Sequence, residues 1–363
     1  MMHILFSGMS GNHGGKETYI FGMYRELLNH GVQMDFLATD PEIAFENEIK
    51  KNGSKVFHIS GRSKGVGQYK RNLEKIFSNN EYDILWAHKT TLSSIEEFDT
   101  AKQAGVKIRI IHSHCTKNMG NHFTAFMHAV NRNRIQRVAN VFFACSNDAG
   151  IYFYKGNIKF HVIRNGFQVD RYKYNPDLEE EIRKELEIGN DFVVGHVGRF
   201  SPEKNHKKII SVFEKIYEKN NNSILLLCGD GDEESAVKVL VKEKNLEGQV
   251  MFLGVRSDVN RILQCFNVML FPSLHEGIPY SLLEAQAAGV PCVISANLSD
   301  DVIESNAVKK IELVDDDKTW AEFCLKYQGY DKTRTKITLK QHGYDLKIQA
   351  DKMYAYLSSL LEH

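Results

Sequence analysis

Short apolar runs alternate with longer segments of helical periodicity along most of the chain. The segment 17–29 is one example, because its apolar residues recur at three- and four-residue spacing. Such alternation is typical of parallel βα units. We expect strands at 3–7, 33–38, 55–58, 84–87, 108–112 and 141–144 in the first half, and at 191–197, 223–227, 250–253, 268–271 and 291–294 in the second.

The βα pattern begins twice, and a polar stretch with little strand character, 170–190, separates the two halves. A chain of 363 residues has room for two domains of roughly 100–200 residues each. We therefore predict Rossmann-like α/β domains over 1–167 and 168–343. The remainder, 344–363, is expected to be an amphipathic helix, with one apolar face formed by Leu346, Ala350, Met353, Leu357 and Leu360.

Composition narrows the class of protein. Lys plus Arg and Asp plus Glu both total 46, so no bulk charge favours a nucleic-acid partner. The six cysteines are widely spaced and include no CxxC pair, which predicts neither a zinc site nor a disulfide framework. The amino terminus has no basic region before its apolar run, and no stretch approaches the roughly 20 apolar residues of a membrane span. We expect a cytoplasmic protein.

One segment departs from this even charge. Between 101 and 140 there are seven basic residues and no acidic one, and 122–139 mixes arginines with apolar residues such as Phe123 and Phe126. A basic amphipathic helix can lie on an anionic membrane, so peripheral contact with the inner face of the cell membrane is one interpretation. A solvated helix that packs its apolar side inward is the other.

The segment after the expected strand 268–271 carries the most chemical information. It leads through a loop into a helix predicted to begin near Pro279, and ligands of open α/β sheets bind beyond the carboxyl ends of strands. Free N–H groups at a helix start suit a diphosphate. Glu276 and Glu284 could then face a sugar and a ribose. Alternatively, Glu284 forms a capping box with Ser281, and Glu276 is a solvated loop residue.

Two further loops follow strands of the second half. Arg199 and Lys204 come after the first of these strands and could bind phosphoryl oxygens, although either alone would be an ordinary surface cation. Asp230 and Asp232 could hold a divalent metal, or their neighbour Gly229 could simply permit a tight turn. We favour the turn and predict no metal, because Arg199 and Lys204 can supply the positive charge.

In the first half, the loop 7–17 contains Gly14 and Gly15. It is either a close backbone approach to a ligand or a flexible turn. His112 ends a strand and could donate a hydrogen bond to a transferred sugar, but lone histidines are more often structural. Nothing local distinguishes His112 from His114.

Taken in order, these segments resemble the family 4 retaining glycosyltransferases of the GT-B fold, and most closely the bacterial capsule and exopolysaccharide branch. The resemblance covers almost the whole chain. One departure is Arg164, which stands where the family usually has a proline. The matching motifs are Gly14–Thr18, His112–His114, Arg164–Gly166, Val197–Phe200, Lys204–His206, Gly229–Gly231, Phe252–Gly254, Pro272–Gly277 and the Glu-x7-Glu pair Glu276 and Glu284.

The resemblance implies two Rossmann-like domains whose parallel sheets face an interdomain cleft, with an acceptor-binding first domain, a donor-binding second domain and a last helix that crosses back to the first. It implies that Arg199 and Lys204 bind the donor diphosphate and stabilise the leaving group, and that Glu284 binds the ribose. Glu276 and the Gly277 backbone would engage the donor sugar, which His112 would also contact. The remaining donor-site residues would be Gly14, Gly15, Gly198, Gly229, Gly254, Ile278 and Pro279.

The activity that the resemblance implies is retaining, metal-independent transfer of a hexose-type sugar from a nucleotide-diphosphate donor, with a UDP-sugar preferred. The acceptor would be a glycan or a polyprenyl-linked glycan of a bacterial surface polysaccharide. Another enzyme class on this fold, such as an epimerase or a phosphorylase, is one alternative, and a non-catalytic partner subunit that binds glycan or protein is another. The presence of Arg199, Lys204, Glu276 and Glu284 favours the transferase.

Overall fold

The computed structural model describes residues 1–12, 14–115, 121–156, 158–276 and 278–362. Contacts divide the chain into two compact units. Unit 1 comprises Met1–Phe167 and Gly343–His363, and unit 2 comprises Gln168–His342. The described part of the chain contains no helix that combines the length and the apolar character needed to cross a bilayer.

Unit 1 is built on a seven-stranded parallel sheet of order β3-β2-β1-β4-β5-β6-β7. Because helices cover both faces, its central strands are apolar almost throughout, as is usual for parallel sheets. The strands are β1 (His3–Ser7), β2 (Gln33–Ala38), β3 (Val56–His58), β4 (Ile84–Lys89), β5 (Ile108–Ser113), β6 (Val141–Ala144) and β7 (His161–Val162).

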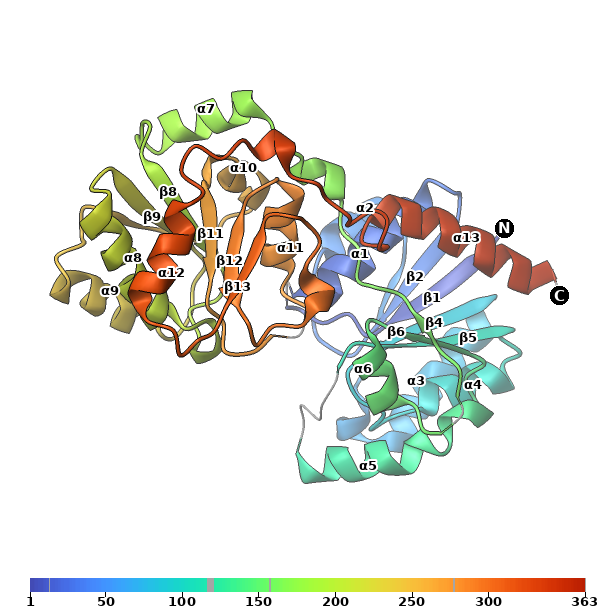
Figure 1. The fold of residues 1–363 in the computed structure, drawn as a ribbon. Coiled ribbons are helices and arrows are strands. Elements are labelled where there is room, and N and C mark those ends of the chain that lie inside the picture. The colour runs from blue at the N-terminus through green and yellow to red at the C-terminus, as the bar shows by residue number, and fades with distance from the viewer. Residues whose placement is uncertain (13, 116–120, 157, 277, 363) are drawn as a thin grey trace. The chain divides into compact units, whose positions relative to one another are not determined.

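The helices of unit 1 pack on the two faces of this sheet (Figure 1). One core contains residues of α1 and α13, and the other contains residues of α3, α4 and α6. The helices are α1 (Gly15–Leu28), α2 (Glu46–Lys51), α3 (Val66–Asn79), α4 (Glu96–Gln103), α5 (His122–Arg132), α6 (Asn147–Phe153) and α13 (Leu346–Glu362), with short 3-10 turns at η1 (Arg62–Lys64) and η2 (Ile135–Arg137).

Unit 2 is built on a six-stranded parallel sheet of order β10-β9-β8-β11-β12-β13. Its strands are β8 (Phe192–Val197), β9 (Ser223–Cys228), β10 (Val250–Gly254), β11 (Val268–Phe271), β12 (Cys292–Ser295) and β13 (Val308–Ile311). Its helices are α7 (Pro176–Glu185), α8 (His206–Lys219), α9 (Glu234–Glu243), α10 (Val259–Ile262), α11 (Tyr280–Ala287) and α12 (Asp317–Leu325), with 3-10 turns at η3 (Val169–Tyr172), η4 (Pro202–Lys204), η5 (Leu263–Cys265), η6 (Asp300–Val302) and η7 (Lys332–Arg334).

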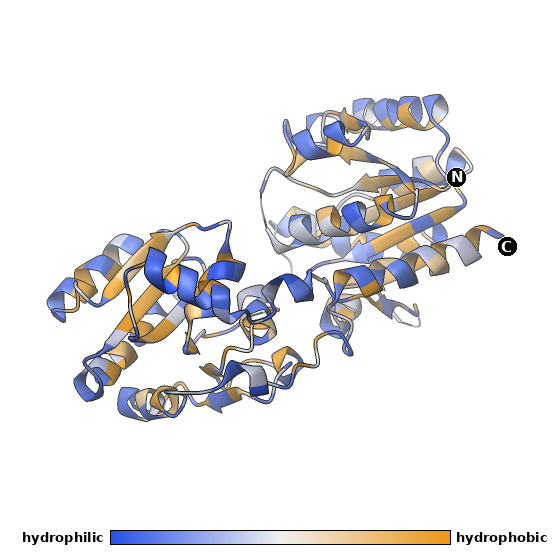
Figure 2. Cartoon of the chain, turned by 90° about the horizontal axis from the view of Figure 1, so that it is seen from above, coloured by the Kyte–Doolittle hydropathy of each residue, from blue (hydrophilic) through white to orange (hydrophobic). Residues whose placement is uncertain are grey.

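The expected strands are all present, with ends that differ by at most two residues, and the predicted Rossmann-like fold of two parallel sheets is confirmed. The strands are the most hydrophobic elements of each unit, which is the signal that predicted them (Figure 2). Two edge strands were missed. β7 has only two residues, both exposed, and β13 places Lys309 and Lys310 between its apolar ends. The polar stretch 170–190 contains helix α7.

The chain leaves unit 1 after Phe167 and returns at Gly343, and backbone hydrogen bonds pair the two crossings. The Phe167 N–H donates to the Tyr344 carbonyl over 2.9 Å, and the Leu346 N–H donates to the Phe167 carbonyl over 3.1 Å. Arg164 reinforces this pairing, because its Nη1 donates to the Tyr344 hydroxyl over 2.9 Å and its guanidinium lies 5.1 Å from that ring's centroid. A proline at position 164 could not make these contacts.

Helix α13 lies beside α1 in unit 1 (Figure 1). Four of its five predicted apolar-face residues are buried, and Leu360 is half-buried. The two helices approach closely at Gly22, where an added Cβ atom would lie 2.4 Å from Leu346 Cδ2. The absence of a side chain at position 22 therefore makes room for Leu346.

We predict that Leu346→Ala loosens α13, since the lost packing and the cavity cost roughly 2–4 kcal/mol. In that background, Gly22→Ala should recover about 1 kcal/mol through helix propensity, because the new methyl group no longer meets Leu346. Hydrogen exchange of α13 amides measures both effects, with the half-buried Leu360→Ala as a milder control. Unchanged exchange in Leu346→Ala would contradict this account of the docking.

Candidate functional site

The strand order brings two loops of unit 2 together. β8 and β11 are neighbours although some 70 residues separate their partners, such as Val194 and Val268. The chain turns to opposite sides of the sheet at this point, where loops leave room for a ligand beyond the carboxyl ends. The loop after β8 carries Arg199 and Lys204, and the loop after β11 carries Glu276.

Lys204 and Glu276 form an ion pair between these loops. Lys204 Nζ lies 2.7 Å from Glu276 Oε1, and the two side chains are only 13% and 12% exposed. The ammonium group also lies 5.0 Å from the centroid of the Phe271 ring, a cation–π distance. Backbone contacts hold the loops in register, because the Leu274 N–H donates to the Glu203 carbonyl over 2.8 Å. The structure thus brings together two of the predicted residues.

Arg199 lies on the same loop as Lys204, and its side chain is exposed. A guanidinium that faces solvent can bind an anion without first losing a buried contact. Lys204 and Arg199 therefore offer one paired and one solvated cation beside the same strand end.

The loop after β9 packs backbone against backbone on the loop after β8. Gly229 has a φ angle of 137°, and a Cβ atom added there would lie 2.1 Å from the Gly198 carbonyl oxygen. The Phe200 N–H donates to the Asp230 carbonyl over 2.7 Å, and the Gly229 N–H donates to the Gly254 carbonyl over 2.8 Å. Gly198, Gly229 and Gly254 therefore shape the turns around the predicted site, as the turn interpretation requires.

The carboxylates of Asp230 and Asp232 are exposed. Among the described residues, the one group of three or more side chains that could together hold a metal ion is His88, His112 and His114 in unit 1. Asp230 and Asp232 take part in no such group. The positive φ angles of Gly229 and Gly231 support the tight turn for this segment.

Glu284 lies in α11, which begins at Tyr280 after the N-cap residue Pro279. Ser281 is inside the helix and the N-cap has no side-chain hydrogen bond, so the capping-box alternative for Glu284 is wrong. Instead, Glu284 Oε1 accepts a hydrogen bond from the Tyr172 hydroxyl over 2.7 Å. Burial raises the pKa of Glu284, and this hydrogen bond and the charge of Arg171 lower it in part.

The remaining predicted residues of this loop precede α11. Ile278 is half-buried and Pro279 is buried, while Gly277 lies outside the described residues. Both described residues stand between Glu276 and the first turn of α11, so they connect the ion pair of the loop to the helix that carries Glu284.

Two buried histidines lie close to Lys204: His206 was predicted only as the end of the Lys204–His206 motif, and His196 was not predicted as a site residue. His196 in β8 pairs its Nδ1 with the Leu270 carbonyl over 3.0 Å, and the His206 ring stacks on Phe200 at 4.2 Å. Burial lowers the pKa of both, and the nearby Lys204 adds to the effect, which brings the pKa of His206 to about 4. Both rings are therefore neutral, and Lys204 is the cation of this cluster. The sequence signal for His206 was the histidine that ends the Lys204-Asn205-His206 motif.

In unit 1, Gly14 is the N-cap residue of α1 and Gly15 is its first residue. The Gly14 carbonyl accepts a hydrogen bond from the Thr18 N–H over 2.9 Å. Lys16 donates to the Gly8 carbonyl and lies 3.1 Å from Glu17, so the loop after β1 is held by its own side chains. His13, within the predicted loop, lies outside the described residues.

His112 is fully buried in unit 1. Its ring packs edge-on against Tyr19 at 5.7 Å and lies 4.4 Å from the His114 ring, and burial lowers its pKa to about 3. His88 Nδ1 lies 2.9 Å from His114 Nε2, and His114 is half-buried. These imidazoles are neutral, so any hydrogen bond to a ligand would come from an uncharged ring. His114 is the more accessible of the two histidines that the sequence could not separate.

Helix α5 has an unusual distribution of side chains. Its buried residues are polar: His128 Nδ1 accepts from the Leu92 N–H over 3.0 Å, and Asn131 donates to the Leu92 carbonyl over 2.7 Å. Phe123 and Phe126, one turn apart, are 62% and 63% exposed. The expectation that this helix packs its apolar side inward is wrong for these two residues.

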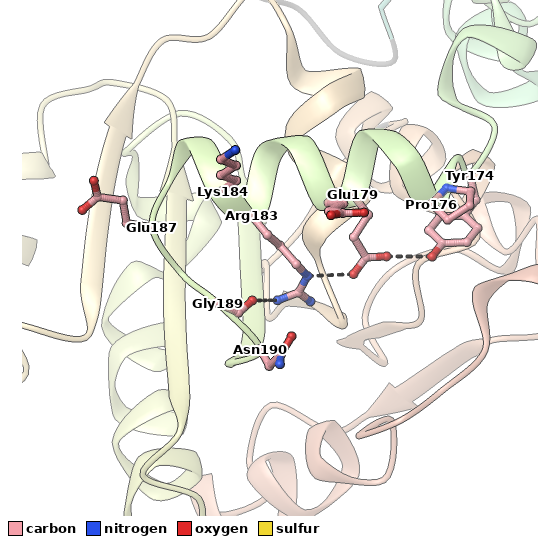
Figure 3. A pocket seen from close by; sticks show the side chains of 9 residues that line it. Tyr174, Pro176, Glu179, Arg183, Lys184, Glu187, Gly189 and Asn190 are labelled. Atoms are coloured by element: carbon pink, nitrogen blue, oxygen red, sulfur yellow. Dashed lines mark hydrogen bonds and ion pairs between the residues drawn. The ribbon is translucent and has the colours of Figure 1, made fainter.

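A pocket along α7 contains none of the predicted residues (Figure 3). Its polar groups bind one another: the Tyr174 hydroxyl donates to Glu179 Oε2 over 2.7 Å, and Arg183 Nε donates to Glu179 Oε1 over 2.9 Å. Arg183 Nη1 also donates to the Gly189 carbonyl over 3.2 Å. These contacts anchor α7 to the segment that leads into the next strand.

Known protein families match both halves of the chain. The family described as Glycosyltransferase Family 4 matches residues 13–171, and Glycosyl transferases group 1 matches residues 178–322. EpsF of Bacillus subtilis (strain 168) is 30% identical to this chain over 360 residues. The match covers 95% of this chain and 92% of EpsF, whose name assigns it provisionally to the glycosyltransferases. The UDP-Gal:alpha-D-GlcNAc-diphosphoundecaprenol alpha-1,3-galactosyltransferase of Escherichia coli is 36% identical over 148 residues, 39% of this chain and 38% of that protein.

Solved structures share the fold. Alr3699/HepE of Anabaena in complex with UDP superimposes with a TM-score of 0.72 at 20% identity, covering 100% of this chain and 98% of that one. A glycosyltransferase from Rickettsia africae ESF-5 superimposes with a TM-score of 0.78 at 16% identity, covering 100% of this chain and 99% of that one.

Proposed function

We propose the following reaction for this chain, which belongs to glycosyltransferase family 4: retaining transfer of a hexose-type sugar from a UDP-sugar to a glycan or polyprenyl-linked acceptor, without a bound metal. The ion pair between Lys204 and Glu276 is the observation that carries the proposal. It supports the proposal because a cation suited to phosphate and a carboxylate suited to sugar hydroxyls lie side by side at the β8–β11 junction, where α/β sheets bind ligands.

The predicted site residues of unit 2 have roles that follow from their chemistry. Arg199 and Lys204 bind the diphosphate and stabilise the negative charge that develops as it leaves. The diphosphate draws Lys204 from Glu276, whose carboxylate then accepts hydrogen bonds from the donor sugar. Glu284 binds the ribose hydroxyls with the oxygen that faces the ligand. The glycines Gly198 and Gly229 allow the backbone to approach the nucleotide closely.

The bond changes take place on one face of the sugar. The bond between the anomeric carbon and the β-phosphate oxygen breaks, and the acceptor hydroxyl oxygen forms the new bond from the same side. The hydroxyl proton passes to the departing phosphate, so that UDP leaves and the anomeric configuration is retained. The cations Arg199 and Lys204 supply the charge stabilisation that a metal ion gives in other transferases, which supports metal independence.

The UDP-bound relative of the same fold supports uridine as the base, and the Escherichia coli galactosyltransferase, named for a diphosphoundecaprenol acceptor, supports a lipid-linked acceptor. We propose a role in bacterial surface polysaccharide synthesis on these grounds. Unit 1 would bind the acceptor, with Gly14, Gly15 and the histidines His112 and His114 near the transferred sugar.

Peripheral membrane contact is part of this proposal. A lipid-linked acceptor lies at the membrane, α5 exposes Phe123 and Phe126, and the segment that follows α5 exposes the cations Arg134 and Arg137. Aromatic side chains that enter the interface, next to cations that meet anionic headgroups, form the pattern of an interfacial helix. The burial of His128 and Asn131 on the opposite side supports this orientation.

We expect calorimetry in EDTA to detect UDP binding and much weaker GDP binding. Glu284→Ala should weaken UDP binding by about tenfold or more, because a charged hydrogen-bond partner of the ribose is lost. Glu243→Ala, which removes an exposed carboxylate of α9, is the matched control. If neither nucleotide binds even after manganese is added, the chain is better explained as a non-catalytic partner subunit.

We expect Lys204→Ala to lower kcat by about a hundredfold or more, since it removes a preorganised charge from the leaving group. Lys238→Ala, which removes a lysine paired with Glu234 on α9, should leave kcat unchanged. The slow hydrolysis of a UDP-α-sugar suffices as the assay. Proton NMR of the fresh product should show the α anomer first, and an initial β anomer would rule out retention.

We expect the protein to sediment with anionic vesicles at modest salt and less with neutral ones. Replacing both Phe123 and Phe126 by serine should weaken binding by at least about tenfold, because each buried ring contributes roughly 1.5–3 kcal/mol. Val239→Ser, a change at a residue that is 57% exposed on α9, is the control. A wild-type protein that stays in the supernatant would remove the membrane contact from the proposal.

A further inference from the structure

Tyr172 is placed where it can control the predicted ribose-binding carboxylate. It ends η3, the first element of unit 2 after the chain leaves unit 1. Its half-buried ring directs the hydroxyl at α11, where it donates to Glu284 Oε1 over 2.7 Å. Nothing in the sequence pattern singled out this residue, since 112 positions separate it from Glu284.

The backbone around Tyr172 is fixed by Gln264, which is fully buried in η5. Gln264 Nε2 donates to the Tyr172 carbonyl over 3.1 Å and to the Asn260 carbonyl over 2.8 Å. Its Oε1 accepts from the Asn175 N–H over 2.9 Å. All polar atoms of this buried amide are used, so it holds the chain on both sides of Tyr172 and limits where the tyrosine side chain can point.

The protonation states suit a fixed donor and a fixed acceptor. Burial and the neighbouring Glu284 carboxylate raise the pKa of Tyr172, so the hydroxyl keeps its proton at any ordinary pH. Burial raises the pKa of Glu284, while Tyr172 and the charge of Arg171, both on η3, lower it. Tyr172 therefore favours the ionised form of a carboxylate that its surroundings would otherwise tend to neutralise.

We propose that Tyr172 is a positioning residue for the donor nucleotide: by holding Oε1 of Glu284, it turns Oε2 toward the ribose hydroxyls and keeps the carboxylate ready to accept their hydrogen bonds. This inference rests on the proposed function, because it takes Glu284 to be the ribose ligand. A glutamate side chain has three rotatable bonds, so one short hydrogen bond to a buttressed tyrosine removes freedom that nucleotide binding would otherwise have to remove.

The test compares Tyr172→Phe with Tyr174→Phe. The control loses the same kind of bond two residues away, since the Tyr174 hydroxyl donates to Glu179 Oε2 over 2.7 Å in the α7 pocket (Figure 3). We expect Tyr172→Phe to weaken UDP binding by about tenfold in calorimetry. Its affinity for 2′,3′-dideoxy-UDP, which lacks both ribose hydroxyls, should equal that of the wild type. Tyr174→Phe should bind both ligands as the wild type does.

The pH dependence gives a second readout. UDP affinity should fall as the pH drops through the pKa of Glu284, because the protonated acid is a poor acceptor. Removing the Tyr172 hydroxyl removes an interaction that lowers this pKa, so the fall in affinity should move to higher pH in Tyr172→Phe. In Tyr174→Phe it should stay at the wild-type pH.

The outcomes separate this inference from the proposed function. If Glu284→Ala weakens UDP binding but Tyr172→Phe does not, Tyr172 is not a positioning residue, although the proposed donor site stands. If Tyr172→Phe weakens UDP and dideoxy-UDP equally, the tyrosine acts on general structure, and the inference is wrong. If Glu284→Ala binds UDP normally, the ribose contact itself is refuted and the inference falls with it.

Discussion

The parallel pairing of β8 with β11 is the constraint on which the candidate site depends. Met269 pairs with Gly195, and a Cβ atom added at Gly195 would lie 1.9 Å from the Phe266 ring, so this glycine makes room for the ring that precedes β11. A parallel strand must be reached by a long crossover, and the strand order reverses at this pair. Two loops far apart in sequence are thereby forced to the same edge, and Lys204 meets Glu276 there.

Electrostatics at this edge follow from what is buried beneath it. His196 and His206 are neutral because burial and the charge of Lys204 disfavour a second cation, so the positive charge remains on Lys204 and Arg199. The charge of Lys204 is balanced by Glu276 across the two loops. An anion can open such an ion pair by replacing the carboxylate as the partner of the lysine. A diphosphate does so most readily, because its phosphoryl groups bind the ammonium group well.

Away from the ion pair, other side chains also connect segments that are distant in sequence. Gln264 fixes the backbone of η3, η3 presents Tyr172, and Tyr172 reaches Glu284 on α11. In unit 1, α13 returns to pack on α1, and Arg164 and Tyr344 join the two chain crossings. In both units, side chains from segments distant in sequence stabilise the loops and crossings that the sheet alone would leave loosely held.

The sequence by itself determined the strands, the two-unit α/β architecture and the residue types of the candidate site, because buried parallel strands form apolar runs and phosphate-binding loops need glycines and cations. It could not find β7 and β13, since edge strands need not be apolar, or settle whether Glu284 caps its own helix. Only the tertiary structure decided that Glu284 bonds to Tyr172, that Lys204 bonds to Glu276 and that α5 turns its phenylalanines outward. These contacts join residues distant in sequence, and the physical reason they stay hidden is that local periodicity reports which face is apolar, not what that face meets.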